Sequence, residues 1–249
     1  MRIYCPEEFP ISLYVNGEEL ATYQLTDQDL IDWTYGHLYT EGMIDSAEEV
    51  VSLQLAEGKI HVKLNESKDL QLLLKRQKHF TAGCGNGVTF FSMTDVKRFP
   101  KIETDTQYAL SYLLKKRHEF AKKSTMYNET GGMHGACIID EKGTVVVRED
   151  IGRHNAVDKI IGYVIRKNID TSKLVLLTTG RVSYEMLAKA ARCGFGIIGS
   201  RTAATKQAVQ LANYLGIEVV GYMRGRNSII YTNRRKVVND LQAKTTASK

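Results

Sequence analysis

The sequence lacks a long apolar run, and it contains only three prolines among its 249 residues. No segment approaches the roughly 20 consecutive apolar residues that are needed to cross a bilayer. The opening MRIYCPEEFP also lacks the apolar core that is typical of a signal peptide. Low-complexity stretches are missing too. We therefore expect a globular cytoplasmic protein that does not bind a membrane.

Cysteine is scarce as well, and no two cysteines form a CxxC pair. Paired cysteines at that spacing are typical of zinc ribbons and of thioredoxin-like redox sites, so the sequence excludes both classes. In a reducing compartment we expect free thiols, and most free cysteines are small buried hydrophobic residues. The four cysteines are Cys5, Cys84, Cys137 and Cys193.

Positive charge is in excess, with a formal net charge of +6 and an isoelectric point near 9.0. An excess of this size favours an anionic partner. The partner could be a nucleotide, a phosphate-bearing cofactor, a nucleic acid or an acidic protein, and the charge alone does not choose among them.

Short alternating segments in the first part of the chain predict two hairpins. Residues 11–15 and 20–23 flank Asn16-Gly17, a dipeptide that favours a type I′ turn. Residues 50–55 and 60–62 predict the second hairpin.

Helices are expected between and after these hairpins. Thr26 is the expected N-cap of a helix that ends at Gly42. Residues 69–74 predict a short helix and residues 104–123 a long one. Together with the hairpins they predict a smaller N-terminal α+β region over residues 1–125.

From about residue 131 onward, short apolar strands alternate with amphipathic helices, a pattern that predicts an α/β layer with parallel strands. We place this layer at residues 126–240, and residues 241–249 form a basic tail. The expected strands are residues 136–140, 144–148, 174–178, 196–199, 218–222 and 228–231, and the expected helices are residues 155–166, 183–192 and 203–215.

Cys84 lies in the glycine-rich run TAGCGNG at residues 81–87. Glycines on both sides free the backbone for unusual turns and leave the sulfur unshielded. Successive backbone N–H groups in such a loop also favour thiolate over thiol, and thiolate is the reactive form. The alternative is a tight loop with an incidental buried cysteine, and the residues alone do not decide between the two.

Three expected turns carry arginine directly after a strand. Free N–H groups and guanidinium groups at such turns bind phosphate groups in many proteins, although similar turns also occur without any ligand. If all three turns lie at one sheet edge, they form a single anionic-ligand site. The candidate residues are Arg181, Ser200, Arg201, Tyr222, Met223, Arg224, Gly225, Arg226 and Asn227.

A polar run, REDIGRHN at residues 148–155, joins an expected strand to an expected helix. It is either a salt-bridge network that caps the helix or part of a ligand site at the end of a strand. The roles of Glu149, Asp150 and His154 therefore stay open, as does that of His134, which precedes another strand.

Together these segments resemble the FdhD family of formate dehydrogenase accessory proteins along nearly the whole chain. The most specific stretch is REDIGRHNAVDKIIG at residues 148–162, followed by TGRVSYEMLAKAA at residues 179–191. The other matching segments are residues 8–10, 15–17, 36–44, 81–87, 132–136, 200–206 and 221–231.

The resemblance implies an α/β fold, a homodimer and a role in sulfur transfer. Its C-terminal part is expected to be a three-layer α/β/α domain that is similar to cytidine deaminases. Sulfur is expected to come from a cysteine desulfurase, to be held as a persulfide on Cys84, and to pass to a bis-molybdopterin guanine dinucleotide cofactor with molybdenum or tungsten. Formate dehydrogenase is the expected recipient of that cofactor, and residues 222–227 match the cofactor-binding stretch of the family.

The chain departs from the family pattern in the Cys84 loop. The usual loop is C-G-x-C-G, but Gly87 stands where the second cysteine is expected. We therefore expect a one-cysteine carrier in which Cys5, Cys137 and Cys193 are not essential. Zinc deaminases need H-x-E and P-C-x-x-C, whereas His134 is followed by glycine and alanine, so we expect no zinc.

Two other functions compete with sulfur transfer. A nucleotide-responsive binding protein would use the same sheet edge, and Cys84 would then be dispensable. A nucleic-acid binder would fit the basic charge and the short basic run Arg234-Arg235-Lys236, but no binding motif accompanies this run. We expect no nucleic acid partner.

Overall fold

The computed structural model describes residues 4–65, 79–80, 88–89, 99–224 and 227–241. The expected helix at residues 69–74, the Cys84 loop, Gly225, Arg226 and nearly all of the basic tail lie outside these residues. Across the part of the chain that is described, no helix combines the length and apolar character that spanning a membrane requires.

The N-terminal region is a four-stranded sheet in the order β2-β1-β4-β3. Both predicted hairpins are confirmed, because β1 pairs with β2 and β3 with β4 in antiparallel fashion. Positive φ angles of 51° at Asn16 and 88° at Gly17 match the expected turn. The strands are β1 (Phe9–Val15), β2 (Glu18–Leu25), β3 (Val50–Ala56) and β4 (Lys59–Leu64), with the short 3₁₀ helix η1 (Ala47–Glu49) before β3.

Helix α1 (Leu30–Thr40) packs against this sheet through Trp33 and Leu38. The expected N-cap at Thr26 is wrong, since the helix begins only at Leu30, after Asp29 in the left-handed conformation. Thr26 is buried, and its N–H and hydroxyl donate to the carboxylate of Asp150 over 3.1 and 2.9 Å. This partner from a distant strand replaces the local capping bond.

The C-terminal region contains a six-stranded sheet in the order β13-β12-β11-β10-β8-β9. The predicted parallel pairing is confirmed for β10, β11 and β12, whereas β8, β9 and β13 join them in antiparallel fashion. The strands are β8 (His134–Ile139), β9 (Val145–Asp150), β10 (Val175–Thr178), β11 (Ile197–Ser200), β12 (Glu218–Gly221) and β13 (Ile229–Ile230).

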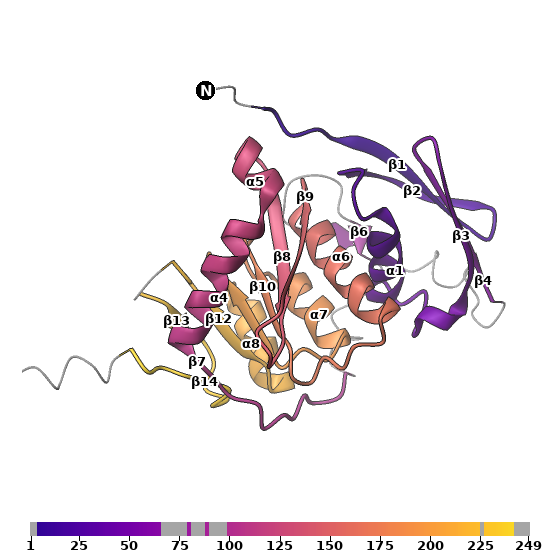
Figure 1. Ribbon diagram of the computed structural model, residues 1–249. Coiled ribbons are helices and arrows are strands. Elements are labelled where there is room, and N and C mark those ends of the chain that lie inside the picture. Colours follow the sequence, from indigo (N-terminus) through magenta and orange to yellow (C-terminus); the bar gives the residue numbers. More distant parts are fainter. Residues whose placement is uncertain (1–3, 66–78, 81–87, 90–98, 225–226, 242–249) are drawn as a thin grey trace, which may run out of the picture.

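Helices cover both faces of this sheet, so the predicted three-layer α/β/α arrangement is confirmed (Figure 1). Alternate strand residues face opposite sides: Ile138 and Leu176 contact the α6–α8 side, while Cys137 and Leu177 contact the α4 side. The helices are α4 (Leu110–Lys123) on one face and α6 (Arg153–Arg166), α7 (Tyr184–Arg192) and α8 (Lys206–Leu215) on the other.

The long helix expected from residue 104 starts instead at Leu110. Tyr108 and Ala109 form β7 (Tyr108–Ala109), which pairs with β14 (Val237–Val238) near the end of the chain. Because α4 packs in the core of the C-terminal sheet, the change in packing precedes the boundary expected near residue 125. The short helix α5 (Thr125–Thr130) follows at the sheet edge where β8 begins (Figure 1).

The Cys84 loop itself is not described, but the chain on each side of it is. Residues 79–80 form β5 (His79–Phe80) and residues 88–89 form β6 (Val88–Thr89), and the two strands pair in antiparallel fashion.

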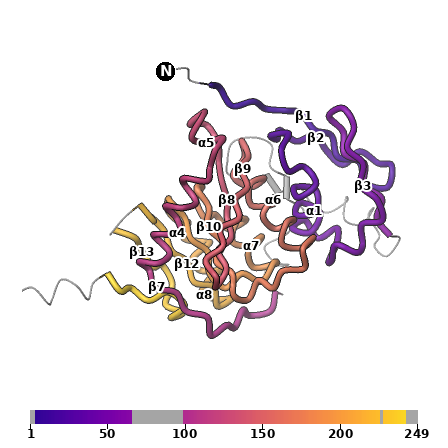
Figure 2. Tube along the Cα trace, in the orientation of Figure 1, coloured from indigo at the N-terminus to yellow at the C-terminus, as the bar shows by residue number. Residues whose placement is uncertain are grey.

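The N-terminal sheet and the C-terminal layers lie side by side and meet where α1 crosses α6 (Figure 2). A Cβ atom added at Gly36 would lie 1.8 Å from the carbonyl oxygen of Asp158, and one added at Gly162 would lie 1.7 Å from that of Asp32. Only glycine, which has no Cβ atom, fits at either position. The two helices therefore touch backbone to backbone.

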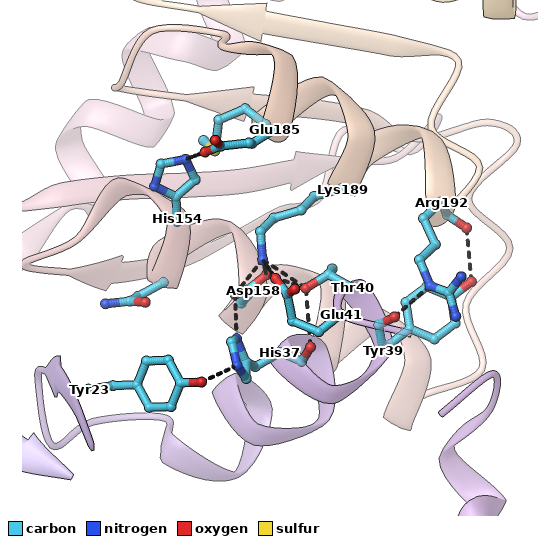
Figure 3. Close-up of polar contacts among 12 residues, drawn as sticks. Tyr23, His37, Tyr39, Thr40, Glu41, His154, Asp158, Glu185, Lys189 and Arg192 are labelled. Carbon is cyan, nitrogen blue, oxygen red and sulfur yellow. Dashed lines mark hydrogen bonds and ion pairs between the residues drawn. The ribbon is translucent and has the colours of Figure 1, made fainter. Parts of the chain in front are cut away.

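Buried charges hold the same junction together (Figure 3). The Lys189 ammonium donates to the Asp158 carboxylate over 2.7 Å, and Thr40 and His37 from α1 also contact that carboxylate. Arg148 from β9 donates to Asp32 of α1 over 2.8 Å. Charge pairs thus link the two regions in addition to the packing of α1 on α6.

Candidate anion-binding site

The three arginine-bearing turns follow the carboxyl ends of β10, β11 and β12, and we call this side of the six-stranded sheet the sheet edge. Thr178 pairs with Ser200 and Gly199 with Val220 in parallel register, so β10, β11 and β12 all end at this edge. Backbone bonds tie the turns together: the Arg201 N–H donates to the Thr178 carbonyl over 3.1 Å, and the Met223 N–H to that of Ser200 over 3.0 Å.

The candidate residues in these turns differ in exposure. Arg181, Tyr222 and Arg224 are exposed, and Arg201 is half-buried. Met223 is buried and packs against Gly199, so it anchors the turn after β12 in the core.

Ser200 is buried as well, and its hydroxyl is already bonded within the protein. It donates to the Gly180 carbonyl over 2.6 Å and accepts from the Thr202 N–H over 2.9 Å. Ser200 therefore links two of the turns. Asn227 is exposed, and Gly225 and Arg226 lie outside the described residues.

A small cavity lies between this edge and the α4–α5 helices. Its volume is about 30 Å³, and Arg117 and Tyr127 from the helices face Thr179, Ser200 and Arg201 from the sheet across it. That volume holds about one water molecule. A nucleotide therefore cannot enter the cavity in this state, and only its mouth is open to a larger ligand.

Three arginines gather around this mouth. The Arg201 guanidinium donates to the Tyr127 hydroxyl over 3.2 Å, and Arg224 donates to the Arg201 carbonyl over 3.0 Å. Burial lowers the pKa of Arg117, and the charges of Arg201 and Arg224 lower it further. Within the described part of the chain, no carboxylate pairs with any of the three guanidinium groups.

The REDIGRHN run has structural partners at this edge. The two carboxylate oxygens of Glu149 accept the N–H groups of Met126 and Tyr127 over 2.9 and 2.8 Å, and they thereby cap α5. Asp150 is fully buried and accepts from the Lys159 ammonium over 2.7 Å. Both carboxylates therefore take part in a network of helix capping and salt bridges, which is the first of the two interpretations of this run.

His134 and His154 lie near the same edge in half-buried positions. Thr179 accepts the N–H of Gly135 over 3.0 Å, which leaves its hydroxyl proton for the Nδ1 atom of His134 at 3.2 Å. Burial lowers the pKa of His134, and the nearby Arg153 and His154 lower it further, so the ring is neutral at pH 7.

His154 pairs with Glu185 over 3.2 Å (Figure 3). Among the described residues, neither histidine belongs to a group of three His, Cys, Asp or Glu side chains that could hold a metal ion.

Three cysteines are described, and Cys84 is not among them. Cys137 is buried in β8, and burial raises the pKa of its thiol. Burial also raises the pKa of Cys193, to about 12, and Cys5 is exposed. At neutral pH the thiols of Cys137 and Cys193 are therefore protonated and poorly nucleophilic.

The sequence did not point to Arg117 or Tyr127. Arg117 lies in the helical run KKRHE, whose composition is the same as that of a solvated helix face. Tyr127 lies in a helix of six residues whose N-cap residue, Ser124, makes no side-chain capping bond. Only the packing of α4 against the sheet brings them to the edge.

Comparison with known proteins agrees with this architecture. The model of the FdhD/NarQ family matches residues 6–238. Proteins named sulfur carrier protein FdhD from Staphylococcus aureus strains Newman and JH9 are each 34% identical to this chain over 237 residues, which cover 94% of this chain and 89% of theirs.

A crystal structure of a protein assigned as a formate dehydrogenase accessory protein from Desulfotalea psychrophila has the same fold. The TM-score is 0.77 at 23% identity, with 96% of this chain and 92% of that chain covered. From the extent of the family match and the identity to its curated relatives, this chain belongs to the FdhD/NarQ family.

Proposed function

We propose that this chain is a sulfur carrier for the maturation of formate dehydrogenase. It accepts sulfur from a cysteine desulfurase as a persulfide on Cys84 and passes it to a bis-molybdopterin guanine dinucleotide cofactor bound at the sheet edge. The names of the relatives support the sulfur-carrying role. The observation that carries the cofactor role is the convergence of the arginine turns at one edge without a compensating carboxylate among the described residues.

Sulfur reaches Cys84 by thiol–persulfide exchange. The Cys84 thiolate attacks the terminal sulfur of the desulfurase persulfide, the S–S bond to the desulfurase cysteine breaks, and that cysteine leaves as a thiolate. No electrons are consumed in this step. Delivery of the same sulfur to the metal as sulfide takes up two electrons, so a thiol reductant belongs in a reconstituted assay.

The cofactor is the cargo of this reaction, and its guanine arms end in negatively charged diphosphates. Charge-assisted bonds from Arg224, Arg201 and Arg181 match such groups. The exposed ring of Tyr222 offers a flat surface for a base at the same rim. The cavity is too small for a nucleotide, so the arms bind over its mouth. The proposal includes no zinc, and it places a homodimer in the cytoplasm.

The first test is sulfur loading at Cys84. The protein is incubated with a cysteine desulfurase and cysteine, and intact-mass analysis should show one added sulfur atom that the Cys84→Ser variant does not gain. Cys84→Ser should also abolish formate dehydrogenase maturation in cells while its unfolding transition stays unchanged. Normal maturation by this variant would contradict the carrier role and favour the nucleotide-responsive alternative.

The second test concerns the cargo. Arg224→Ala should weaken GDP binding by about ten- to a hundredfold, or about 1.5–3 kcal/mol, because it removes a charge-assisted contact. Calorimetric titration measures this effect. Sulfur loading at Cys84 should be unaffected, because loading requires only the thiol and the donor. Unchanged GDP affinity would show that the turn after β12 is only a solvated loop.

A further inference from the structure

Arg117 is part of the sheet edge in space although it belongs to a different layer. It lies on α4, in the layer opposite α6–α8, and its side chain lines the same cavity as Arg201 and Thr179. Arg224 reaches this group from the turn after β12 through its bond to the Arg201 carbonyl. Arg117 from the helix and Arg201 from one strand end thus line the cavity, and Arg224 from a second strand end lies beside them.

These three positive charges lie close enough to act on one another, and none forms an ion pair with a described carboxylate. No aspartate or glutamate is among the described residues that line the cavity. Burial and the two neighbouring arginines disfavour the charged form of Arg117, which lowers its pKa. The folded protein therefore bears an electrostatic cost at this position, and an anion bound between the three groups removes it.

A chain of contacts keeps Arg201 in position. Glu149 at the end of β9 caps α5 through the N–H groups of Met126 and Tyr127. The Tyr127 hydroxyl in turn accepts from Arg201, whose guanidinium lies 5.9 Å from the centre of the tyrosine ring. Arg201 is thereby aligned before any ligand arrives, and alignment of this kind improves affinity.

We propose that helices α4 and α5 complete a diphosphate-binding subsite at the sheet edge, in which Arg117, Arg201 and Arg224 bind the phosphate oxygens and Tyr127 positions Arg201. The inference rests on the proposed function for the natural source of the diphosphate, which is a guanine dinucleotide arm of the cofactor. Because Arg224 is exposed and the other two arginines are half-buried, the diphosphate binds at the mouth of the cavity. Recognition is of the phosphates and is independent of the base.

Arg117→Gln tests the subsite, with Lys115→Gln as its matched control. Lys115 is exposed on the same helix, so its replacement removes the same charge without touching the cavity. GDP, ADP, inorganic pyrophosphate and guanosine are titrated into each protein by calorimetry. Arg117→Gln should weaken binding of GDP, ADP and pyrophosphate alike, by about ten- to a hundredfold, and leave guanosine binding unchanged. Lys115→Gln should change none of them by more than about twofold.

Three outcomes would overturn the proposal. One is a wild-type protein that does not bind pyrophosphate, and another is an equal effect of the two substitutions. The third is an effect of Arg117→Gln on guanosine as large as on GDP, which would assign the arginine to the base. Sulfur loading at Cys84 is measured on the same variants. A failure to load sulfur would count against the proposed function and leave the diphosphate result standing.

Thermal unfolding separates ligand binding from a structural role of Arg117. Without any anion, Arg117→Gln should unfold at the wild-type temperature or above it, because the substitution relieves the repulsion from Arg201 and Arg224. Pyrophosphate should then stabilise the wild-type protein and have little effect on the variant. A variant that unfolds at lower temperature and gains as much from pyrophosphate would assign Arg117 to packing.

Tyr127→Phe tests the positioning role. The substitution removes the hydroxyl that accepts from Arg201 and keeps the ring beneath the guanidinium. We expect a smaller loss of pyrophosphate affinity than for Arg117→Gln, of about two- to tenfold. An unchanged affinity would show that Arg201 is positioned without Tyr127.

Discussion

Glu149 and Asp150 are neighbours in the sequence, yet each stabilises a different part of the molecule. Glu149 caps α5 at the outer end of the sheet, and Asp150 binds Thr26 and Lys159 in the buried junction with the N-terminal region. Consecutive residues of a strand point to opposite faces, which explains the division. Glu149 and Asp150 thus stabilise the fold, whereas the arginines of the turns are the charged groups that a ligand can reach.

At the same scale, the environments of the cysteines predict which of them can carry sulfur. Cys137→Ala and Cys193→Ala should both retain sulfur transfer, because burial keeps these thiols protonated at neutral pH. Cys137→Ala should cost about 1 kcal/mol of stability through the small cavity that it leaves. Transfer assays and urea unfolding measure the two effects. Loss of transfer by a folded Cys193→Ala protein would mean that a single cysteine is not sufficient.

Residue roles were predictable from the sequence only where the signal is local. The position of arginines directly after apolar strands predicted that their turns meet at one sheet edge, because parallel strands all end on one side of a sheet. Thr26 shows the limit: its local pattern is that of an N-cap, but its partner Asp150 is 124 residues away. Arg117 reaches the edge in the same non-local way, and nothing in its neighbours distinguishes it from a solvated residue.

Among the elements, the crossing of α1 and α6 has the strictest geometric requirement. Gly36 is pressed against the backbone of Asp158, and Gly162 against that of Asp32. Any Cβ atom at these points overlaps a carbonyl group that cannot rotate away, unlike a flexible side chain. Both glycines are interior helix residues of low helix propensity, and this close contact accounts for their presence.

Gly36→Ala should therefore destabilise the protein strongly. The added methyl group would lie 1.8 Å from a carbonyl oxygen, so the helices must separate, and we expect a loss of at least about 2–3 kcal/mol in the free energy of unfolding. Gly131→Ala is the control. Its φ is 71° but no atom lies within 4 Å, so only backbone strain of about 1 kcal/mol applies. Urea unfolding of both variants is the measurement, and equal losses would contradict the steric argument.

Elements with a strong local pattern were predicted well, and those made by distant pairing were not. Both N-terminal hairpins have turn residues with positive φ, and the helix expected from residue 183 begins there, with Ser183 capping α7 by accepting the N–H of Met186. The strands β7 and β14 have two residues each and exist only because they pair across the chain. Their pairing also explains why α4 begins six residues later than its helical pattern suggested.

At the scale of the whole molecule, buried charges connect two hydrophobic cores. One core belongs to the N-terminal sheet and α1, and the other to the α6–α8 side of the large sheet. Between them, Lys189 contacts both Asp158 and Glu41. Burial disfavours the charge of Asp158, but Lys189 and His37 outweigh it and hold the pKa of this carboxyl below its ordinary value.

The pH dependence of stability follows from the direction of this shift. A carboxyl whose pKa is lower in the folded state contributes stability above its unfolded pKa of about 3.9, and that contribution is lost as the pH falls through the folded value. We therefore expect a steep loss of stability below about pH 4. His134 adds to the loss from about pH 6.5 downward, because its folded pKa is also lowered.

Asp158→Asn should remove part of this dependence. It leaves the Lys189 ammonium buried with fewer partners, so at pH 7 we expect a cost of about 3–5 kcal/mol. Below pH 4 the difference from the wild-type protein should shrink, since the Asp158 carboxyl of the unfolded wild-type chain then binds a proton that the folded protein does not, and the stability from its charge is progressively lost. Urea unfolding between pH 3 and pH 7 follows both trends. A constant difference over this range would show that the charge of Asp158 does not contribute to the junction.

The junction also determines the order in which the chain can fold. The contact between Thr26 and Asp150 closes a loop of 124 residues, and such long-range contacts form late. On the ribosome the N-terminal sheet and α1 emerge first, when Asp32 and Glu41 do not yet have Arg148 and Lys189 as partners. The N-terminal region therefore gains these partners only after α6 and α7 have been synthesised.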